Sequence, residues 1–387
     1  MYNVIFNAFC EVTHYREIAF KFPLCYNLLR QKPALFRGIM VYVLGIESTC
    51  DETACSIVRD GHEILSNVVS SQIDLHKEYG GVVPELACRR HIDVIIPVIK
   101  QALADAELEL EDIDLISVAK GPGLIGALLI GLNTAKALAL ALKKPFVGVN
   151  HVEAHLYATI MTYRQEISFP ALGVVVSGGH TNLIHIKDIG HYSLISGTVD
   201  DSIGEAFDKV ASILGLPYPG GPEVEALALT GDPQYFKLKA GHVKGKPLDF
   251  SFSGLKTKVL YAAKGQSSNK HSPLIITEDE KKHLAASFQE CALKDISNKS
   301  ALAIKEYPCK SIILGGGVCN NQRLLEIFKE RLSEIPVFAP PKGLTMDNAA
   351  MIAGLGFHYH QTGTEGDPLD LEASSRSFFH GSSKDAV

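Results

Sequence analysis

The sequence predicts an α/β protein of two similar lobes with a ligand cleft between them. Two segments, VYVLGIESTCDETACSIV and ALGVVVSGGHTNLIHI, each give a strand, a polar turn and a returning strand. Two others, LISVAKGPGLIGALLIGLNTAKALALAL and SIILGGGVCNNQRLLEIFKERL, each run from a strand through a glycine loop into a helix. Strands that alternate with helices form α/β layers. Two copies of each device indicate two lobes, and the place where lobes meet is a usual ligand site.

The composition is that of an ordinary globular protein. The chain has 387 residues, of which 46% are hydrophobic and 21% charged. Its length favours two domains or lobes, because single cores usually stop growing near about 250–300 residues. The formal net charge of −6 argues against a stand-alone nucleic-acid binder, since phosphate recognition normally leaves a basic surface. Any RNA contact is therefore expected to be local, or shared with a partner.

Neither the cysteines nor the apolar stretches indicate an extracellular or membrane protein. The eight cysteines are scattered without a C-x-x-C pair, which predicts reduced thiols in a cytoplasmic protein. One stretch, Leu124 to Leu142, is long enough to cross a membrane, but Asn133, Thr134 and Lys136 interrupt it. We expect a buried core helix there and no membrane association.

The order of the segments predicts four regions. Residues 1–39 form an N-terminal extension, from an upstream start or a presequence, since Met40 stands directly before the first strong strand. A chain beginning at Met40 is expected to fold and to remain active. A helical insert is expected from Ser71 to Lys100, broken at Pro84, and a last helix from Asn348 to Gln361. The remaining regions are a first lobe with the insert, a second lobe, and the last helix with a tail that packs back on the first lobe, at 40–160, 161–345 and 346–387.

The glycine turns are candidate nucleotide contacts. Backbone N–H groups in such turns can bind an anion, and SGGH places Gly178 and Gly179 in one, although a tight hairpin is the plain alternative. In the segment DDSIGEAFDKVASILGLPYPGGP, Asp208 offers a carboxylate to ribose hydroxyls, or is only an exposed helix residue. The glycine pair that ends at Gly221 offers a flat surface to a base. Asn321 either caps the helix after three glycines or faces a nucleoside.

The motif HVEAH is the sharpest metal signal. His151 and His155 are four residues apart and lie on one face of a helix, a spacing that suits a divalent metal. In zinc peptidases the glutamate of H-E-x-x-H follows the first histidine, whereas Glu153 is two residues on and points to nearly the opposite side. A peptidase is therefore the weaker interpretation. The site needs a third ligand, and Asp347, at a helix start in TMDNAAMIA, is the best candidate.

Nine segments, in order across roughly residues 42–354, carry a family resemblance: LGIESTCDET, GGVVPELACRRH, KGPGLIGALLIG, NHVEAH, VSGGHTNLI, GEAFDKVASILGLPYPGGP, DFSFSGLKT, GGGVCNNQRL and TMDNAAMIA. Together they resemble the tRNA N6-adenosine threonylcarbamoyltransferase family, whose bacterial members are called TsaD and were once described as glycoprotein endopeptidases. The departures are few. Ala54 stands where the family commonly has glycine, and residues 1–39 have no counterpart.

The resemblance implies an actin-like, sugar-kinase-like fold, in agreement with the duplicated segments. It implies transfer of a threonylcarbamoyl group from threonylcarbamoyl-AMP to N6 of the adenosine next to the anticodon, in tRNAs that read codons beginning with adenine. It also implies one divalent metal, Fe(2+) or Zn(2+), held by His151, His155 and Asp347. Substrate contacts carry over to Val175, Val176, Ser177, Gly178, Gly179, Asp208, Gly221 and Asn321.

The resemblance further implies partners: tRNA and, as in the bacterial members, a smaller TsaB-like paralogue and a TsaE-like ATPase. The residue that removes the amine proton stays open among Asp51, Glu52 and His180, each of which either faces the cleft or only orders its loop. The candidates for tRNA phosphates, otherwise ordinary surface charges, are Arg89, Arg90, Lys256 and Lys258.

Other classes of protein compete with this interpretation. A phosphotransferase or ATPase of the same architecture holds magnesium mainly through carboxylates and phosphates, so two histidine ligands argue against it. A non-catalytic scaffold subunit would not require the nucleotide and metal residues together. A metallo-glycopeptidase would depend on Glu153 as its base.

Overall fold

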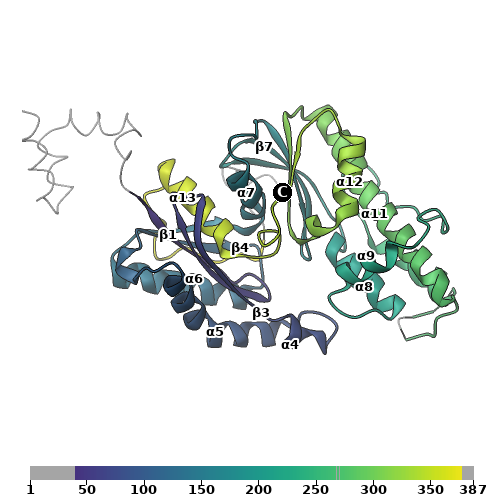
Figure 1. The fold of residues 1–387 in the computed structure, drawn as a ribbon, viewed down its shortest axis with the longest axis horizontal. Coiled ribbons are helices and arrows are strands. Elements are labelled where there is room, and N and C mark those ends of the chain that lie inside the picture. Colours follow the sequence, from purple (N-terminus) through teal and green to yellow (C-terminus); the bar gives the residue numbers. More distant parts are fainter. Residues whose placement is uncertain (1–39, 267, 270, 377–387) are drawn as a thin grey trace, which may run out of the picture. The chain divides into compact units, whose positions relative to one another are not determined.

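Two sheets of the same design form the framework of the protein (Figure 1). The computed structural model describes residues 40–376 apart from 267 and 270, and the expectations for residues 1–39 lie outside the described residues. The first sheet has the order β3-β2-β1-β4-β5 and the second the order β10-β9-β6-β7-β8. In each sheet three antiparallel strands are followed by two parallel ones. This shared order confirms the predicted duplication.

The elements have the following bounds. The strands are β1 (Tyr42–Glu47), β2 (Glu52–Arg59), β3 (Glu63–Ser71), β4 (Leu115–Gly121), β5 (Phe146–Asn150), β6 (Ala171–Val176), β7 (Thr181–Asp188), β8 (His191–Gly197), β9 (Ser311–Gly315) and β10 (Val337–Phe338). The helices are α4 (Ile73–Lys77), α5 (Pro84–Asp105), α6 (Ile125–Leu142), α7 (His151–Thr162), α8 (Ile203–Leu214), α9 (Gly220–Ala228), α10 (Ser253–Lys264), α11 (Glu278–Glu306), α12 (Gln322–Arg331) and α13 (Ala349–Gln361), with short 3₁₀ turns η2 (Leu110–Asp112) and η3 (Gly317–Asn320).

Three local predictions are confirmed. The expected helical insert is the pair α4 and α5, and Pro84 is the first residue of α5, where its missing N–H removes no helical hydrogen bond. The last helix, α13, begins after Asn348, whose side chain accepts a hydrogen bond from the Met351 N–H. The six cysteines within the described ranges are all free thiols.

The pleat of β1 decides which of its side chains meet α7. The strand is buried on both faces because helices cover both sides of the sheet. Leu44 and Ile46 pack with α5 and α6, whereas Val43 belongs to the buried cluster of α7 and α13. Successive side chains of a strand alternate, so Glu47 shares the face of Val43. A carboxylate is thereby directed toward α7.

α13 and α7 form a layer between the two sheets (Figure 1). A side chain at Gly45 of β1 would collide with the Ala349 carbonyl oxygen, so only glycine lets α13 approach the strand so closely. The Ser117 hydroxyl of β4 donates a 2.6 Å hydrogen bond to the Ile352 carbonyl of α13. One buried cluster contains residues from both helices and from both sheets. The ends of α7 and α13 therefore lie where the sheets meet.

α6 is buried on one face only. Ala127, Leu128 and Leu132 are buried, whereas Ile125 and Leu129 on the opposite side are exposed. The predicted core helix is confirmed for the inner face, and the apolar outer face is a difference from that prediction. Among the described residues, α6 is also the single helix whose length and composition would allow it to cross a membrane. This is weak evidence for a membrane span, because core helices of soluble proteins pass the same test and one face of α6 is buried.

Candidate functional site

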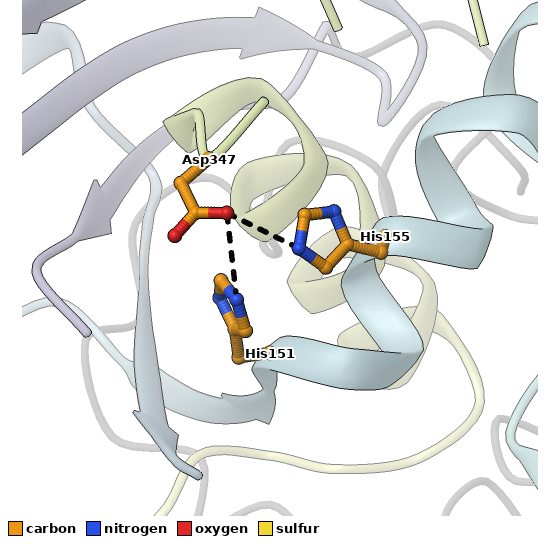
Figure 2. A group of neighbouring side chains, drawn as sticks. All are labelled: His151, His155 and Asp347. Carbon is orange, nitrogen blue, oxygen red and sulfur yellow. Dashed lines mark ion pairs between the residues drawn. The ribbon is translucent and has the colours of Figure 1, made fainter. Parts of the chain in front are cut away.

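A cluster of two histidines and an aspartate joins α7 to the start of α13 (Figure 2). α7 begins at His151 because the Asn150 side chain accepts hydrogen bonds from two N–H groups of the first turn. Asp347 Oδ1 lies 3.6 Å from His151 Nε2 and 3.2 Å from His155 Nε2. The candidate ligand atoms all lie within 4.8 Å of one another. The structure thus brings together the three residues that the sequence indicated as ligands.

Glu47 orients the first histidine of this cluster. Its Oε2 lies 2.9 Å from His151 Nδ1, and its Oε1 accepts a 2.6 Å hydrogen bond from the Thr49 N–H. A carboxylate on one ring nitrogen fixes the tautomer and leaves the other nitrogen free for a metal. Sequence reasoning missed Glu47. The available signal was an acidic residue closing an otherwise apolar strand, VYVLGIE.

The residues of the cluster fit a divalent cation. The His155 ring is 1% exposed, and neither of its nitrogens makes a hydrogen bond within the described structure. His155 Nε2 faces Asp347 Oδ1 at 3.2 Å as an ion-pair neighbour but makes no hydrogen bond, whereas buried polar atoms are nearly always hydrogen-bonded. A cation placed between both Nε2 atoms and the Asp347 carboxylate would give His155 Nε2 the partner that it lacks. Iron and zinc both accept such nitrogen and oxygen ligands.

Burial and the charged groups around the cluster shift the pKa values of His151 and His180 in opposite directions. Burial alone would lower the pKa of His151, but the carboxylates of Glu47 and Asp347 outweigh burial and raise that pKa to about 9. Burial, together with His151 and His155, lowers the pKa of His180 to about 3. At neutral pH the His180 ring is therefore uncharged.

Glu153 points away from the cluster, as its spacing predicted. It is fully buried, and its Oε2 accepts a hydrogen bond from the Tyr359 hydroxyl of α13. This contact ties α7 to α13, the two elements that place His151, His155 and Asp347. Glu153 is accordingly in no position to act on a metal-bound water.

The cluster borders a cleft of about 1090 Å³ that is lined by residues of both sheets' turns. Gly178, Gly179 and Gly221 line it, and a Cβ added to any of them would have no neighbouring atom within 4 Å. Their backbones therefore face open space. This volume is slightly above the usual range for ligand pockets, about 300–1,000 Å³, and leaves room for a nucleotide and a second group.

Asp208 stands beside these glycines rather than on an exposed helix face. It lines the cleft, and its Oδ1 accepts a 2.7 Å hydrogen bond from the Gly220 N–H. A Cβ on Gly220 would collide with Ala211 of α8, so glycine lets α9 lie against α8 at this point. Burial raises the pKa of Asp208 to about 6, against the lowering effect of the Gly220 and Gly221 N–H groups.

The remaining predicted substrate residues divide into two groups. Ser177 and Asn321 line the cleft. Asn321 is also a helix cap, since its Oδ1 accepts a hydrogen bond from the Leu324 N–H. The side chains of Val175 and Val176 are fully buried in β6 and do not line the cleft, because the strand carries them into the core before the glycine turn begins. They position the turn.

The three candidate bases all line the cleft. Glu52 is 6% exposed, and burial, with the charges of Asp347 and Asp51, raises its pKa well above the ordinary value. The His180 backbone is fixed by Ser177, whose hydroxyl accepts a 3.0 Å hydrogen bond from the His180 N–H. Geometry alone thus leaves all three in place, whereas Glu52 and His180 differ in the direction of their pKa shifts, upward for Glu52 and downward for His180.

The residues expected to meet tRNA phosphates are not equally free. Arg89 Nη2 lies 2.6 Å from Glu85 Oε1 on the exposed side of α5. Lys256 Nζ lies 2.7 Å from Asp201 Oδ2 at the edge of the cleft. Lys258 Nζ instead donates a 2.9 Å hydrogen bond to a backbone carbonyl. Lys256 is therefore committed to an internal ion pair that the sequence did not reveal.

Comparison with known proteins gives consistent matches. The family model described as TsaD, tRNA N6-adenosine threonylcarbamoyltransferase, matches residues 63–354. Over 335 residues the chain is 64% identical to a protein of Protochlamydia amoebophila described as tRNA N6-adenosine threonylcarbamoyltransferase, and the match covers 87% of this chain and 97% of that protein. A protein of the same description from Chlamydia felis is 50% identical over 314 residues, covering 81% and 90%.

Solved structures of HypF share the fold. Full-length HypF in the phosphate- and nucleotide-bound form has a TM-score of 0.57 at 14% identity, with 84% of this chain and 47% of that chain covered. HypF from T. kodakarensis has a TM-score of 0.55 at 12% identity, with 84% and 48% covered. The predicted actin-like, sugar-kinase-like fold is thereby confirmed.

Proposed function

The chain belongs to the tRNA N6-adenosine threonylcarbamoyltransferase family, and from that premise we propose how its cleft serves the reaction. The enzyme transfers a threonylcarbamoyl group to N6 of an adenosine in tRNA. The observation that carries the proposal is one cleft that holds the His151–Asp347 pair, the open glycines and Asp208 together. An adenine N6 amine is a poor nucleophile because its lone pair is delocalised into the ring. Positioning and charge stabilisation are therefore the main levers.

The donor is threonylcarbamoyl-AMP, a mixed anhydride whose AMP group leaves readily. Gly178 and Gly179 offer backbone N–H groups to its phosphate, where no side chain stands in the way. Asp208 accepts hydrogen bonds from the ribose hydroxyls, and Gly221 gives the adenine a flat surface beside it. Asn321 closes the base side of the cleft. The glycine N–H groups at one end and the Asp208 carboxylate at the other thus frame the nucleotide without enclosing the carbamoyl end.

His151, His155 and Asp347 would hold one divalent cation, iron or zinc, with Glu47 fixing the His151 ring. When bound, the metal supplies positive charge to the donor's phosphate or carbamoyl oxygen. The chain's own contribution is a rigid set of three ligands beside the nucleotide. A glycopeptidase would need a base at this metal, and Glu153 is hydrogen-bonded to Tyr359 instead.

Glu52 is the residue that we assign to remove the N6 proton. A general base works best when its pKa is near the working pH, and burial with two neighbouring carboxylates moves the pKa of Glu52 upward. The pKa of His180 near 3 makes that ring a weak base. Asp51 then keeps the pKa of Glu52 raised by its negative charge, beside the incoming adenosine.

Analysis of tRNA nucleosides tests this function. Cells depleted of the protein should lose N6-threonylcarbamoyladenosine from tRNAs that read codons beginning with adenine. The purified protein, supplied with threonylcarbamoyl-AMP, tRNA and its partner subunits, should restore it in mass spectra. Unchanged modification after depletion would reject the assignment, and ATP turnover without any change in tRNA would support a phosphotransferase instead.

A TsaB-like paralogue would cover the outer face of α5 and α6, which we call the apolar face. α5 exposes Ile92 and Ile96, and α6 exposes Ile125, Leu129 and Leu140. The two helices make one surface, since Gly126 of α6 packs against the Cys88 thiol of α5. A paralogue of the same fold carries an equivalent helix pair, and two such pairs can pack as a helical layer. A TsaE-like ATPase would join this assembly in the cytoplasm, where the tRNA is.

The double substitution Ile92→Glu with Leu129→Glu should weaken binding of the paralogue by at least about 30-fold, because charges would be buried in an apolar contact. Isothermal titration with the purified paralogue measures this loss. The control is Leu229→Glu. Leu229 is the C-cap residue of α9, is 78% exposed and belongs to neither α5 nor α6, so this variant should bind the paralogue normally. Equal affinity of the double variant and the wild type would remove the apolar face from the assembly.

A further inference from the structure

A lysine-rich loop stands out against the acidic chain. Between residues 231 and 264 there are seven lysines and only two acidic residues, although the whole chain has a net charge of −6. Four of these lysines lie in residues 236–249, which we call the lysine loop: Lys237, Lys239, Lys244 and Lys246. Positive charge is therefore concentrated on one segment, as an acidic protein requires if it is to meet RNA.

The lysine loop is anchored by its apolar residues and directs its lysines outward. Phe236, Leu238 and Leu248 pack against the core of the second sheet, while Lys237 and Lys239 between and beside them are exposed. The Phe236 N–H donates a 3.2 Å hydrogen bond to a serine hydroxyl of α11, and a β8 serine hydroxyl donates one of 2.7 Å to the Leu248 carbonyl. Both ends are thus fixed, so binding costs less ordering entropy than it would in a free loop.

The charges of the lysine loop are largely uncompensated. Among the described residues, Lys237, Lys239 and Lys244 make no ion pair. Lys246 lies 3.5 Å from Asp249, but its side chain is 69% exposed. Such an exposed pair is weak and is readily exchanged for a phosphate. This differs from Lys256, which Asp201 holds at the cleft.

The lysine loop lies one helix away from the cleft. The Lys258 ammonium of α10 donates a 2.9 Å hydrogen bond to the Lys239 carbonyl, so the loop rests against α10. On its other side, α10 lines the cleft with Lys256, Thr257 and Leu260. A helix is about 10 Å across. When one base of an RNA strand enters the cleft, the phosphates of the neighbouring nucleotides can reach across α10 to the lysine loop.

We propose that the lysine loop binds phosphates of the tRNA next to the nucleotide that enters the cleft. The inference rests on the proposed function and adds the surface that receives the substrate. Lysines that replace counterions on phosphates give binding that depends on salt and not on sequence. Such binding suits an enzyme that modifies several tRNAs, because it leaves recognition of the target base to the cleft.

The test is a triple variant of the full chain, Lys237→Gln, Lys239→Gln and Lys244→Gln. Its matched control replaces three other exposed lysines on β7, α11 and α12: Lys187→Gln, Lys305→Gln and Lys329→Gln. Dissociation constants for a tRNA transcript are measured over a range of salt concentrations. We expect the triple variant to bind about tenfold or more weakly at low salt, with a salt slope smaller by about 2. Affinity for AMP and the transfer rate at saturating tRNA should match the wild type.

Three results would overturn the proposal while the wild type still modifies tRNA. The first is an unchanged tRNA affinity and salt slope in the triple variant. The second is an equal loss in the control, which would show a general charge effect. The third is unchanged tRNA affinity with lost binding of the paralogue, which would assign the lysine loop to a protein contact. A wild-type chain that transfers nothing to tRNA would instead reject the proposed function itself.

Discussion

Replacing His151 or Asp347 by alanine should remove the bound metal and lower the transfer rate by on the order of 10³-fold or more, with the fold intact. Each residue supplies one of three ligand atoms that lie within 4.8 Å of one another, so the loss of one leaves too few to retain the ion. Both residues line the cleft, and their removal opens no large hole in the core. Elemental analysis, the unfolding temperature and mass measurement of tRNA nucleosides check the three parts of this expectation.

Two further variants make the metal experiment graded. Glu47→Gln should weaken metal affinity about 10- to 100-fold without abolishing it, because it removes the charge that orients the His151 ring. Glu153→Gln should keep both metal and activity, since the amide still accepts the hydrogen bond from Tyr359. Full activity in metal-free His151→Ala protein would show that the reaction does not require the metal. Inactivation by Glu153→Gln with the metal retained would support the alternative hypothesis of a metallopeptidase.

Glu52→Gln should lower turnover by about 10²- to 10⁴-fold, the usual contribution of a general base, and should leave donor affinity unchanged. The base acts only when it is deprotonated, so the wild-type rate should rise with pH through the pKa of Glu52. Burial and the charges of Asp347 and Asp51 place that rise above the ordinary glutamate value of about 4.3. In the Gln variant this limb of the pH profile should disappear.

Asp51→Asn and His180→Asn serve as comparisons for Glu52. Asp51→Asn removes one of the charges that raise the pKa of Glu52, so the acidic limb should move to lower pH. His180→Asn should keep the limb in place. A wild-type pH profile in Glu52→Gln, together with loss of the limb in Asp51→Asn, would transfer the role of base to Asp51.

The fold was predictable because its information is local and occurs twice. The strand, turn and strand of β1 and β2 recur in β6 and β7, and each of these units can be recognised from a short stretch of sequence. The helical spacing of His151 and His155 likewise fixed their common face before any tertiary contact was known. Asp347 needed only a helix start and an acidic side chain.

The parts that were missed depend on contacts between distant segments. Glu47 meets His151 across 104 positions, and Glu153 meets Tyr359 across 206, so no local pattern encodes either pair. Lys256 was expected to face RNA, but its partner Asp201 lies 55 positions earlier, in the loop between β8 and α8. Val175 and Val176 belong to a matched motif, and a motif does not tell which of its residues reach the ligand and which only hold the strand.

The repeated turns after β1 and β6 have diverged into opposite electrical characters. After β1, Asp51 ends the turn and Glu52 begins β2, whereas after β6 the turn contains Gly178 and Gly179. Both pairs line the same cleft. A phosphate is repelled by the acidic pair and drawn to the backbone N–H groups of the glycine pair. The cleft thereby has a polarity, and we expect an anionic substrate to lie in it with its phosphate toward the second sheet and its reactive carbon toward the first.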